Sequence, residues 1–192
     1  MNTTDIFKLL NTLNDLKHLK RTGWVKFNLC NEHLKINKPE TVASHMYRMA
    51  MFAMVLDDKT CDQIKCIKMA LVHDLGEAII GDITPHCGVS STEKHRLEKD
   101  AMEQISKMVP LSVGSDWYSL WQEYEERQTK EAIIVKHLDE FDMVAQAFHY
   151  EQKYEMEEFF EATRNSFTLE PFVSWIEELR KKRCLLKNSV QH

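Results

Sequence analysis

The chain has 192 residues, of which 43% are hydrophobic and 29% charged, so it can bury a core and is not a disordered polymer. Its net charge of −5 offers no basic surface to offset nucleic-acid phosphates, which argues against polymeric DNA or RNA as a partner. Only 5 glycines and 4 prolines occur, which disfavours a sheet protein with many turns and favours long helices joined by short loops.

The cysteines and the N-terminus indicate a cellular location. The 5 cysteines include no CxxC pair and no spacing typical of a disulfide framework. The first residues lack the basic start and the unbroken apolar run of a signal peptide. No run of about 18 apolar residues occurs, so no membrane span is expected. These features predict a cytoplasmic protein in a reducing compartment, without a membrane partner.

The first half of the chain begins with an amphipathic helix. Residues 5–20 carry leucines such as Leu9 and Leu13 at spacings of three and four, which predicts one helix. Residues 21–40 break this period and contain a glycine and a proline, so they are expected to form a loop. The next helix is expected from about Ser44.

The following helix has recognisable start and stop signals. Thr60 with Gln63 three residues later predicts a capping box at its start. The helix is expected to run to Asp74 or Leu75, with Gly76 as its stop.

The second half of the chain continues the helical pattern after an irregular stretch at residues 77–91. Further helices are expected at 92–108, 116–127, 130–154 and 171–183, and the last dozen residues are expected to be loose. The sequence therefore predicts an all-α protein, a bundle of about seven helices. It is expected to form a single domain over residues 1–192, with a core at about 5–165 and a C-terminal helix at about 171–183.

The pair His73-Asp74 is unusual because it closes an otherwise apolar helix. An imidazole and a carboxylate without partners are both costly to bury there. A divalent ion removes this cost, because it binds a neutral imidazole and an ionised carboxylate together.

Two further residues could complete such a site. His45 lies near the start of the preceding helix, and Asp139 lies beside the apolar stripe of the helix at 130–154. Two His and two Asp would leave coordination positions open, as metal catalysis requires. Alternatively, Asp139 could pair with Lys136 or Arg127, and His45 could bond a carboxylate at its own helix start.

Three segments carry a family resemblance: ETVASHMYRMAMFAM, KMALVHDLGEAIIGDITP and KHLDEFDMVAQA. With His45, His73-Asp74 and Asp139 in this order, the chain resembles the HD-domain metal phosphohydrolases. More narrowly, it is similar to the HD-domain-containing protein 2 branch and to the bacterial 5′-deoxynucleotidases, over roughly residues 5–165.

The resemblance implies an activity and a cofactor. It implies one divalent ion (Mn, Co, Zn, Fe or Mg) on the four ligands, in an enzyme that is a phosphoric monoester hydrolase. The implied substrate is a deoxyribonucleoside 5′-monophosphate, cleaved to deoxynucleoside and phosphate. The resemblance also implies that the enzyme is a homodimer. Relatives whose HD motif continues with Gly-Lys bind two metals, whereas Glu77 occupies the Lys position here, so one ion is favoured.

The resemblance also assigns roles to residues around the ligands. Glu77 maps onto the candidate general base, with a solvated carboxylate at a helix end as the alternative. Asp82 maps onto a substrate-contacting carboxylate that could also assist proton transfer, and it is equally a turn-forming residue. Arg21 is a candidate phosphate clamp, and Trp24 is a candidate substrate contact or a core aromatic.

The segment 121–128 resembles the substrate-lining stretch of the family, which makes Glu123, Tyr124 and Glu125 candidate substrate contacts. Core packing explains most of this segment equally well. Two rival functions remain open at this point. One is an HD phosphohydrolase for a nucleoside triphosphate or cyclic nucleotide, and the other is a metal-stabilised binding module.

Overall fold

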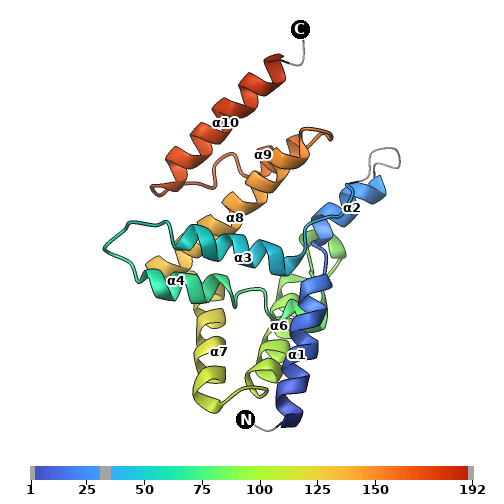
Figure 1. Cartoon of the computed structure of the whole chain (residues 1–192), viewed down its shortest axis with the longest axis vertical. Coiled ribbons are helices and arrows are strands. Elements are labelled where there is room, and N and C mark those ends of the chain that lie inside the picture. The colour runs from blue at the N-terminus through green and yellow to red at the C-terminus, as the bar shows by residue number, and fades with distance from the viewer. Residues whose placement is uncertain (1–2, 31–35, 190–192) are drawn as a thin grey trace.

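The computed structural model describes residues 3–30 and 36–189, which form helices and no strand (Figure 1). An isolated antiparallel bridge joins Lys20 to Thr41. The helices in chain order are α1 (Thr3–His18), α2 (Thr22–Cys30), α3 (Val42–Ala53), α4 (Gln63–Ala70), α5 (Glu77–Ile80), a 3₁₀ turn η1 (Pro85–Cys87), α6 (Ser91–Ser106), α7 (Leu111–Glu126), α8 (Lys130–Tyr150), α9 (Glu157–Ala162) and α10 (Phe172–Ser189).

The predicted all-α class is confirmed. Seven of the ten α-helices in the described chain correspond to the seven expected from apolar periodicity. The other three are short: α2 has 9 residues, α5 has 4 and α9 has 6. Helices of this length carry too few turns to show a clear period, so packing against other elements decides whether they form.

Helix α8 is the centre of the fold, because it contacts α3, α4, α7, α9 and α10. Helices α3 and α4 also contact each other, so these two and α8 form a three-helix unit (Figure 1). Their apolar faces meet in a core that includes Met49, Met69 and Leu138, each with 0% exposed surface. The candidate ligands lie on or beside these three helices, so the centre of the fold holds the site.

Residues 22–30 form helix α2, so the prediction of a loop over 21–40 is wrong there. Trp24 and Phe27 lie on one face of α2 and bury their rings in a second core with Met156 and Ile176. This burial outweighs the low helix propensity of Gly23. Residues 31–35 of the expected loop lie outside the described chain, and residues 36–40 form no helix or strand, as predicted.

The start of α4 differs from the predicted capping box at Thr60. Asp62 is the N-cap, and its side chain accepts a hydrogen bond from Lys65 N over 3.0 Å. Thr60 instead donates its hydroxyl to Asp58 in the preceding turn. Asp is among the favoured N-cap residues, and its position three residues before Lys65 fits the N-cap geometry.

The end of α4 also differs from the prediction, because the helix ends at Ala70 and residues 71–76 form turns. Gly76 is not a stop but the N-cap of α5, with an ordinary φ of −60°. The chain turns out of α5 at Gly81, whose φ of 79° is a conformation that side chains with a Cβ rarely adopt. The positive φ at Gly81 comes only after α5, so α5 follows His73 and Asp74 directly and stays close to them.

Helices α6 and α7 pack closely at one point. A Cβ added to Gly114 in α7 would lie 2.0 Å from the carbonyl oxygen of Ser106 in α6. Only glycine permits this approach, which fixes the spacing of the two helices near the connection between them.

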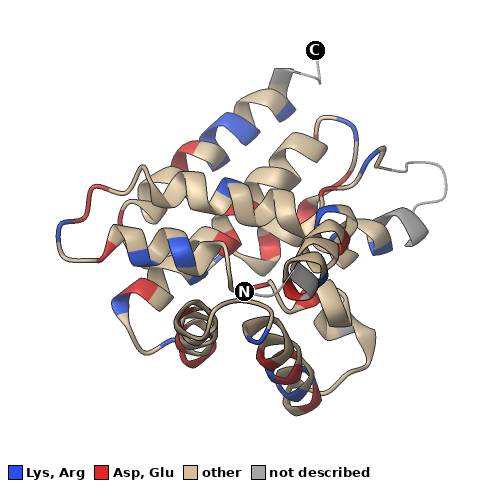
Figure 2. Cartoon of the chain, turned by 60° about the horizontal axis from the view of Figure 1, so that its bottom comes forward, with Lys and Arg blue, Asp and Glu red and all other residues tan. Residues whose placement is uncertain are grey.

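Helix α10 continues to Ser189, so the expectation of a loose tail is wrong up to that residue. Arg183 anchors the helix: its Nη2 donates to Glu151 and Glu157 over 2.5 Å each, and its guanidinium lies over the Phe160 ring. In Figure 2, Lys and Arg are interspersed with Asp and Glu over the helices in view. Within the described ranges, no helix combines the length and apolar character needed to cross a bilayer.

Candidate metal centre

His45 is held at the start of α3 by a well-formed helix cap. Thr41 is the N-cap, and a capping box with Ser44 starts the helix at Val42. This places His45 in the first turn, with its side chain 0% exposed. Its Nδ1 lies 2.7 Å from Oδ2 of Asp142 on α8. Because a carboxylate can only accept, Nδ1 is the donor and Nε2 faces the other way.

His73 and Asp74 lie in the turns after α4, where the backbone is no longer a regular helix. His73 Nδ1 lies 3.0 Å from the carbonyl oxygen of Ala70. Since a carbonyl only accepts, Nδ1 donates and Nε2 is left without a hydrogen when the ring is neutral. Nε2 of His73 lies 3.1 Å from Oδ2 of Asp74, so the neighbouring side chains converge as a shared ion requires.

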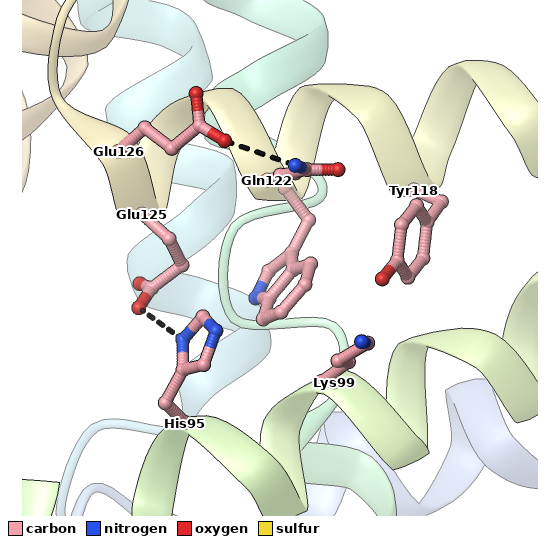
Figure 3. A pocket seen from close by; sticks show the side chains of 7 residues that line it. His95, Lys99, Tyr118, Gln122, Glu125 and Glu126 are labelled. Atoms are coloured by element: carbon pink, nitrogen blue, oxygen red, sulfur yellow. Dashed lines mark hydrogen bonds and ion pairs between the residues drawn. The ribbon is translucent and has the colours of Figure 1, made fainter. Parts of the chain in front are cut away.

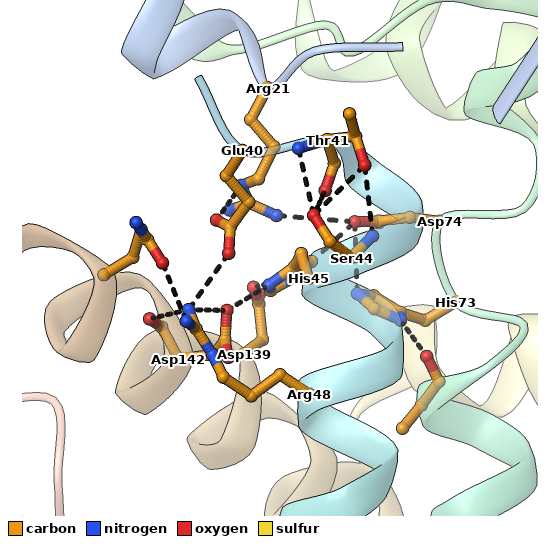
Figure 4. A network of polar contacts seen from close by, with 12 residues as sticks. Arg21, Glu40, Thr41, Ser44, His45, Arg48, His73, Asp74, Asp139 and Asp142 are labelled. Carbon is orange, nitrogen blue, oxygen red and sulfur yellow. Dashed lines mark hydrogen bonds and ion pairs between the residues drawn. The ribbon is translucent and has the colours of Figure 1, made fainter. Parts of the chain in front are cut away.

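The three side chains form one compact group (Figure 4). His45, His73 and Asp74 each offer a ligand atom, and these atoms lie within 4.8 Å of one another. Nε2 of both histidines is buried and has no hydrogen-bond partner. Two buried imidazole nitrogens aimed at a carboxylate fit a divalent cation, because such an ion would satisfy both nitrogens and the carboxylate together.

Asp139 borders this group and is held by two donors. Its Oδ2 accepts from the hydroxyl of Tyr124 over 3.0 Å and from Lys136 Nζ over 2.8 Å. Its Oδ1 lies 3.2 Å from Nε2 of His45, without hydrogen-bond geometry. Asp139 therefore directs Oδ1 at the group formed by His45, His73 and Asp74. The pairing of Asp139 with Lys136, given above as an alternative to metal binding, occurs at the same time.

The charges around the group shift the pKa values of its members. Burial and Arg21 lower the pKa of His45, but the nearby carboxylate of Asp139 and the hydrogen bond to Asp142 outweigh them and raise it to about 9. Burial raises the pKa of Asp74, but the charges of His73 and His45 dominate and hold it below its usual range. Without a metal, these side chains therefore hold a proton between them. A divalent cation that binds the same atoms would displace that proton.

Arg21 lies at the edge of the group. Its Nη1 is 3.9 Å from Oδ2 of Asp74, and its Nε is 4.0 Å from Oε2 of Glu40. The backbone N–H of Arg21 donates to the carbonyl of Glu40, next to the bridge that joins the segments before α2 and α3. A guanidinium in this place can bind an oxyanion that also reaches the metal group.

Glu77 and Asp82 follow the HD pair. Glu77 is 6% exposed, and its Oε2 is buried without a hydrogen-bond partner. Burial and the charges of Asp74 and Asp82 raise the pKa of Glu77 well above its usual value. Asp82 accepts from Thr22 N over 2.6 Å through Oδ2, so it caps the start of α2. The solvated alternative for Glu77 is excluded, and Asp82 has a structural contact whatever else it does.

Of the other predicted substrate contacts, Tyr124 lies at the site, whereas Trp24 and Glu123 have partners elsewhere. Tyr124 reaches the site through Asp139, and its ring lies 4.8 Å from that of His73. Trp24 is 1% exposed and packs edge-on against Tyr150, so its position supports the alternative of a core aromatic. Glu123 instead pairs with Lys65 over 2.7 Å.

Glu125 lies on another face of α7, in a separate pocket of about 190 Å³ between α6 and α7 (Figure 3). Its Oε2 lies 3.4 Å from Nδ1 of His95, whose ring stacks on Trp121. Consecutive residues of a helix point about 100° apart, so Tyr124 and its two acidic neighbours cannot face the same site.

The sequence reasoning missed three charged residues behind His45: Glu40, Arg48 and Asp142. Asp142 is 0% exposed and bonds both His45 and Arg48. A signal was present, because Asp142 follows Asp139 by three residues and Arg48 follows His45 by three, which places each pair on one helix face.

Comparisons with known proteins agree with this architecture. The profile described as HD domain matches residues 13–173. The 5′-deoxynucleotidase HDDC2 of Dictyostelium discoideum is 41% identical, covering 95% of this chain and 98% of that protein. The human protein of that name is 37% identical, covering 93% of this chain and 86% of its own. A conserved hypothetical protein from Pyrococcus furiosus has a similar solved structure, with a TM-score of 0.73 and 28% identity, covering 91% and 99% of the two chains. The chain therefore belongs to the HD-domain family and, within it, to the group of HDDC2 proteins.

Proposed function

We propose that this protein is a metal-dependent 5′-deoxynucleotidase, which hydrolyses deoxyribonucleoside 5′-monophosphates to the deoxynucleoside and phosphate. The observation that carries the proposal is the pair of buried Nε2 atoms of His45 and His73, which lack partners and face Asp74. The relatives named 5′-deoxynucleotidase, at 37% and 41% identity, support the choice of substrate.

The proposed ligands are His45, His73, Asp74 and Asp139, which would hold one divalent ion such as Mn, Co, Zn, Fe or Mg. Such an ion supplies Lewis-acid polarisation of a phosphate oxygen and activation of water. Nitrogen and oxygen donors of this kind suit all five metals. Asp139 completes the set by turning Oδ1 toward His45 while Tyr124 and Lys136 hold Oδ2.

Arg21 is the proposed phosphate clamp. Its guanidinium lies 3.9 Å from Asp74, so a phosphate at the metal group would lie within reach of its planar donors. The same donors would stabilise the charge that develops on the phosphate oxygens in the transition state. Asp82 supports this arrangement by capping α2 at Thr22, the residue after Arg21.

Glu77 is the proposed general base. Its carboxyl group is buried beside Asp74 and has a raised pKa, which brings its proton affinity closer to that needed near neutral pH. In its ionised form it would take the proton from the attacking water. After the bond to the sugar oxygen breaks, the protonated Glu77 can return that proton to the leaving deoxynucleoside.

A monophosphate fits the charge around the site better than a triphosphate. Arg21 is engaged by Glu40 and Asp74, and Lys136 is engaged by Asp139. Lys94 is likewise paired with Glu98 over 3.3 Å. Few cations therefore remain to neutralise the additional charges of a triphosphate chain.

An assay with metal-stripped protein tests the proposal. Phosphate release would be measured from deoxy- and ribonucleoside 5′-monophosphates after each metal is restored. We expect release from the deoxy series, and its loss in Asp74→Ala and in Glu77→Ala with metal present. Asp116→Ala, which removes an exposed carboxylate paired with Lys68, is the matched control and should keep full activity.

Two outcomes would change the proposal. Equal release from ribonucleotides would keep the chemistry and discard the sugar selectivity. No release from any monophosphate, with metal bound and the fold intact, would transfer the assignment to triphosphates, cyclic nucleotides or a binding role.

The organisation of the protein is also part of the proposal. We expect one domain over the whole chain, working as a cytoplasmic homodimer, as the family resemblance implies. Light scattering on the purified protein would check the dimer, and a monomer at assay concentration would refute it.

A further inference from the structure

Behind His45, on the side away from Asp74, lies a line of charged groups in the interior (Figure 4). Asp142 is 0% exposed, and the side chains of Glu40 and Arg48 are 6% and 29% exposed. Charges removed from water in this way are costly unless each has partners, so their arrangement needs an explanation.

Asp142 fixes the orientation of His45. Its Oδ2 lies 2.7 Å from Nδ1 of the imidazole, which makes Nδ1 the donor and directs Nε2 at Asp74 and Asp139. The ring cannot turn about its bond to Cβ without losing this contact. A carboxylate on the far nitrogen also makes the imidazole a stronger ligand.

Arg48 in turn fixes Asp142. Its Nε donates to Oδ1 of Asp142, and its Nη2 donates to Oδ2 over 3.0 Å, a two-pronged contact that sets the carboxylate plane. Its Nη1 donates to Gln146 over 2.7 Å. All three nitrogens of the guanidinium therefore have an acceptor, which holds Arg48 in place against Asp142.

Glu40 joins this line to Arg21. Its Oε1 accepts from Arg48 over 3.0 Å, and its Oε2 accepts from the indole of Trp24 over 3.2 Å and lies 4.0 Å from Nε of Arg21. The backbone carbonyl of Glu40 also accepts from the N–H of Arg21 over 3.0 Å. One buried carboxylate thus contacts both the support of the metal ligand and the proposed phosphate clamp.

We propose that Glu40, Arg48 and Asp142 form a positioning unit that directs Nε2 of His45 at the metal and aligns Arg21 with the same place. In this proposal none of the three is a ligand of the metal or a contact of the phosphate, because each acts through His45 or Arg21. The part that concerns Arg21 rests on the function proposed above, whereas the part that concerns His45 rests only on the contacts within the chain.

The proposal predicts two effects that can be measured separately, one on metal affinity and one on substrate binding. Asp142→Asn keeps an acceptor for Nδ1 but removes the charge, so the affinity of the metal-stripped protein for Mn²⁺ or Co²⁺ should fall roughly 10–100-fold. Glu40→Gln keeps the size of the side chain but removes the charge beside Arg21. It should raise KM about tenfold at saturating metal, because Arg21 is no longer aligned with the bound phosphate, and it should also lower kcat, because Arg21 stabilises the transition-state charge as well.

The experiment combines calorimetric titration of Mn²⁺ or Co²⁺ into the stripped protein with steady-state kinetics. Arg183→Gln is the matched control, because Arg183 is also a half-buried arginine that bridges two carboxylates, Glu151 and Glu157. This variant should keep wild-type metal affinity and KM. Circular dichroism would establish that each variant is folded.

The outcomes distinguish the two proposals. Wild-type metal affinity in folded Asp142→Asn, or an unchanged KM in folded Glu40→Gln, would overturn the positioning unit. If Asp142→Asn does not fold, Arg48→Lys gives the same test, because it keeps the charge and loses the two-pronged contact. If the wild-type protein binds metal but hydrolyses no nucleotide, the proposed function fails while the metal titrations still decide the role of Asp142.

Discussion

The hydroxyl of Tyr124 on α7 donates a hydrogen bond to Oδ2 of Asp139 on α8 over 3.0 Å. Because Oδ2 also accepts from Lys136, only Oδ1 is turned toward His45. We expect Tyr124→Phe to release the carboxylate and to weaken metal binding about tenfold, as removal of a hydrogen bond to a metal ligand commonly does. Titration of Co²⁺ into the metal-stripped variant would measure this.

Tyr118→Phe is the control for Tyr124→Phe, because Tyr118 also lies on α7 but lines the separate pocket with His95 and Trp121. It should bind the metal as the wild type does. Equal affinities in both variants would show that Tyr124 only packs against the His73 ring.

Glu77→Gln should make the metal-free protein more stable and the enzyme inactive. Burial and two nearby carboxylates raise the pKa of Glu77 in the folded state above its value of 4.5 in the unfolded chain. The folded state therefore holds the proton more tightly, and this stabilisation is lost as pH rises from 4.5 through the raised pKa. Glutamine does not titrate, so the variant should keep its stability as pH rises. Its kcat should fall by about 10²–10⁴-fold, because the general base is lost.

Urea unfolding of stripped protein at several pH values between 4 and 8 would check this prediction for Glu77→Gln. The wild-type midpoint should decline more steeply with pH than that of the variant. Parallel curves would mean that Glu77 is ionised without cost and has another environment in solution.

Trp24→Ala should act on stability more than on substrate binding. The indole is 1% exposed and lies against Phe159 and Tyr150, so its removal leaves a cavity that costs about 3–5 kcal/mol. Denaturant unfolding would measure the loss. An unchanged free energy of unfolding, together with a raised KM, would contradict the core position and restore Trp24 as a substrate contact.

The thiols should differ in reactivity. Hydrogen bonds from Thr84, together with the charge of Lys26, lower the pKa of exposed Cys87. Burial raises the pKa of Cys66 to about 12, so it holds its proton throughout the neutral range. A disulfide reagent at pH 7.5 (about one unit below the usual thiol pKa) should modify Cys87 well before Cys66, which should react only after unfolding.

Mass spectrometry of the modified protein would identify the cysteine in each case. Cys87→Ser should remove the fast labelling at position 87, while the exposed Cys184 still reacts and Cys66 stays slow. Early labelling of Cys66 would show that α4 opens in the native state.

The long helices could be predicted from the sequence because each repeats an apolar stripe over several turns. Helix α2 could not, because Trp24 and Phe27 are buried by α8, α9 and α10, which lie far away in the sequence. Asp62 replaced Thr60 as the cap of α4, a shift of two residues that local patterns do not resolve.

The centre of the site followed from residue type and order, since His45, His73 and Asp74 do come together. Asp142 did not, because its role depends on a contact with His45 across 97 positions of the chain. Glu123 and Glu125 are expected at the site because the segment 121–128 resembles the substrate-lining stretch of the family, but the turn of the helix directs them elsewhere. Sequence order can suggest which residues meet, but the facing of each side chain depends on the packed helices.

Gly114 has a consequence far from its own surroundings. Helix α7 is a stiff rod, and ten residues separate Gly114 from Tyr124, a span of about 15 Å. Even a methyl group at position 114 would push the start of α7 away from α6 and tilt the helix, displacing the hydroxyl that holds Asp139. A mutational scan that measures activity would then record position 114 as intolerant of substitution and suggest an active-site residue. Its role, however, is only to allow the close approach of α7 to α6.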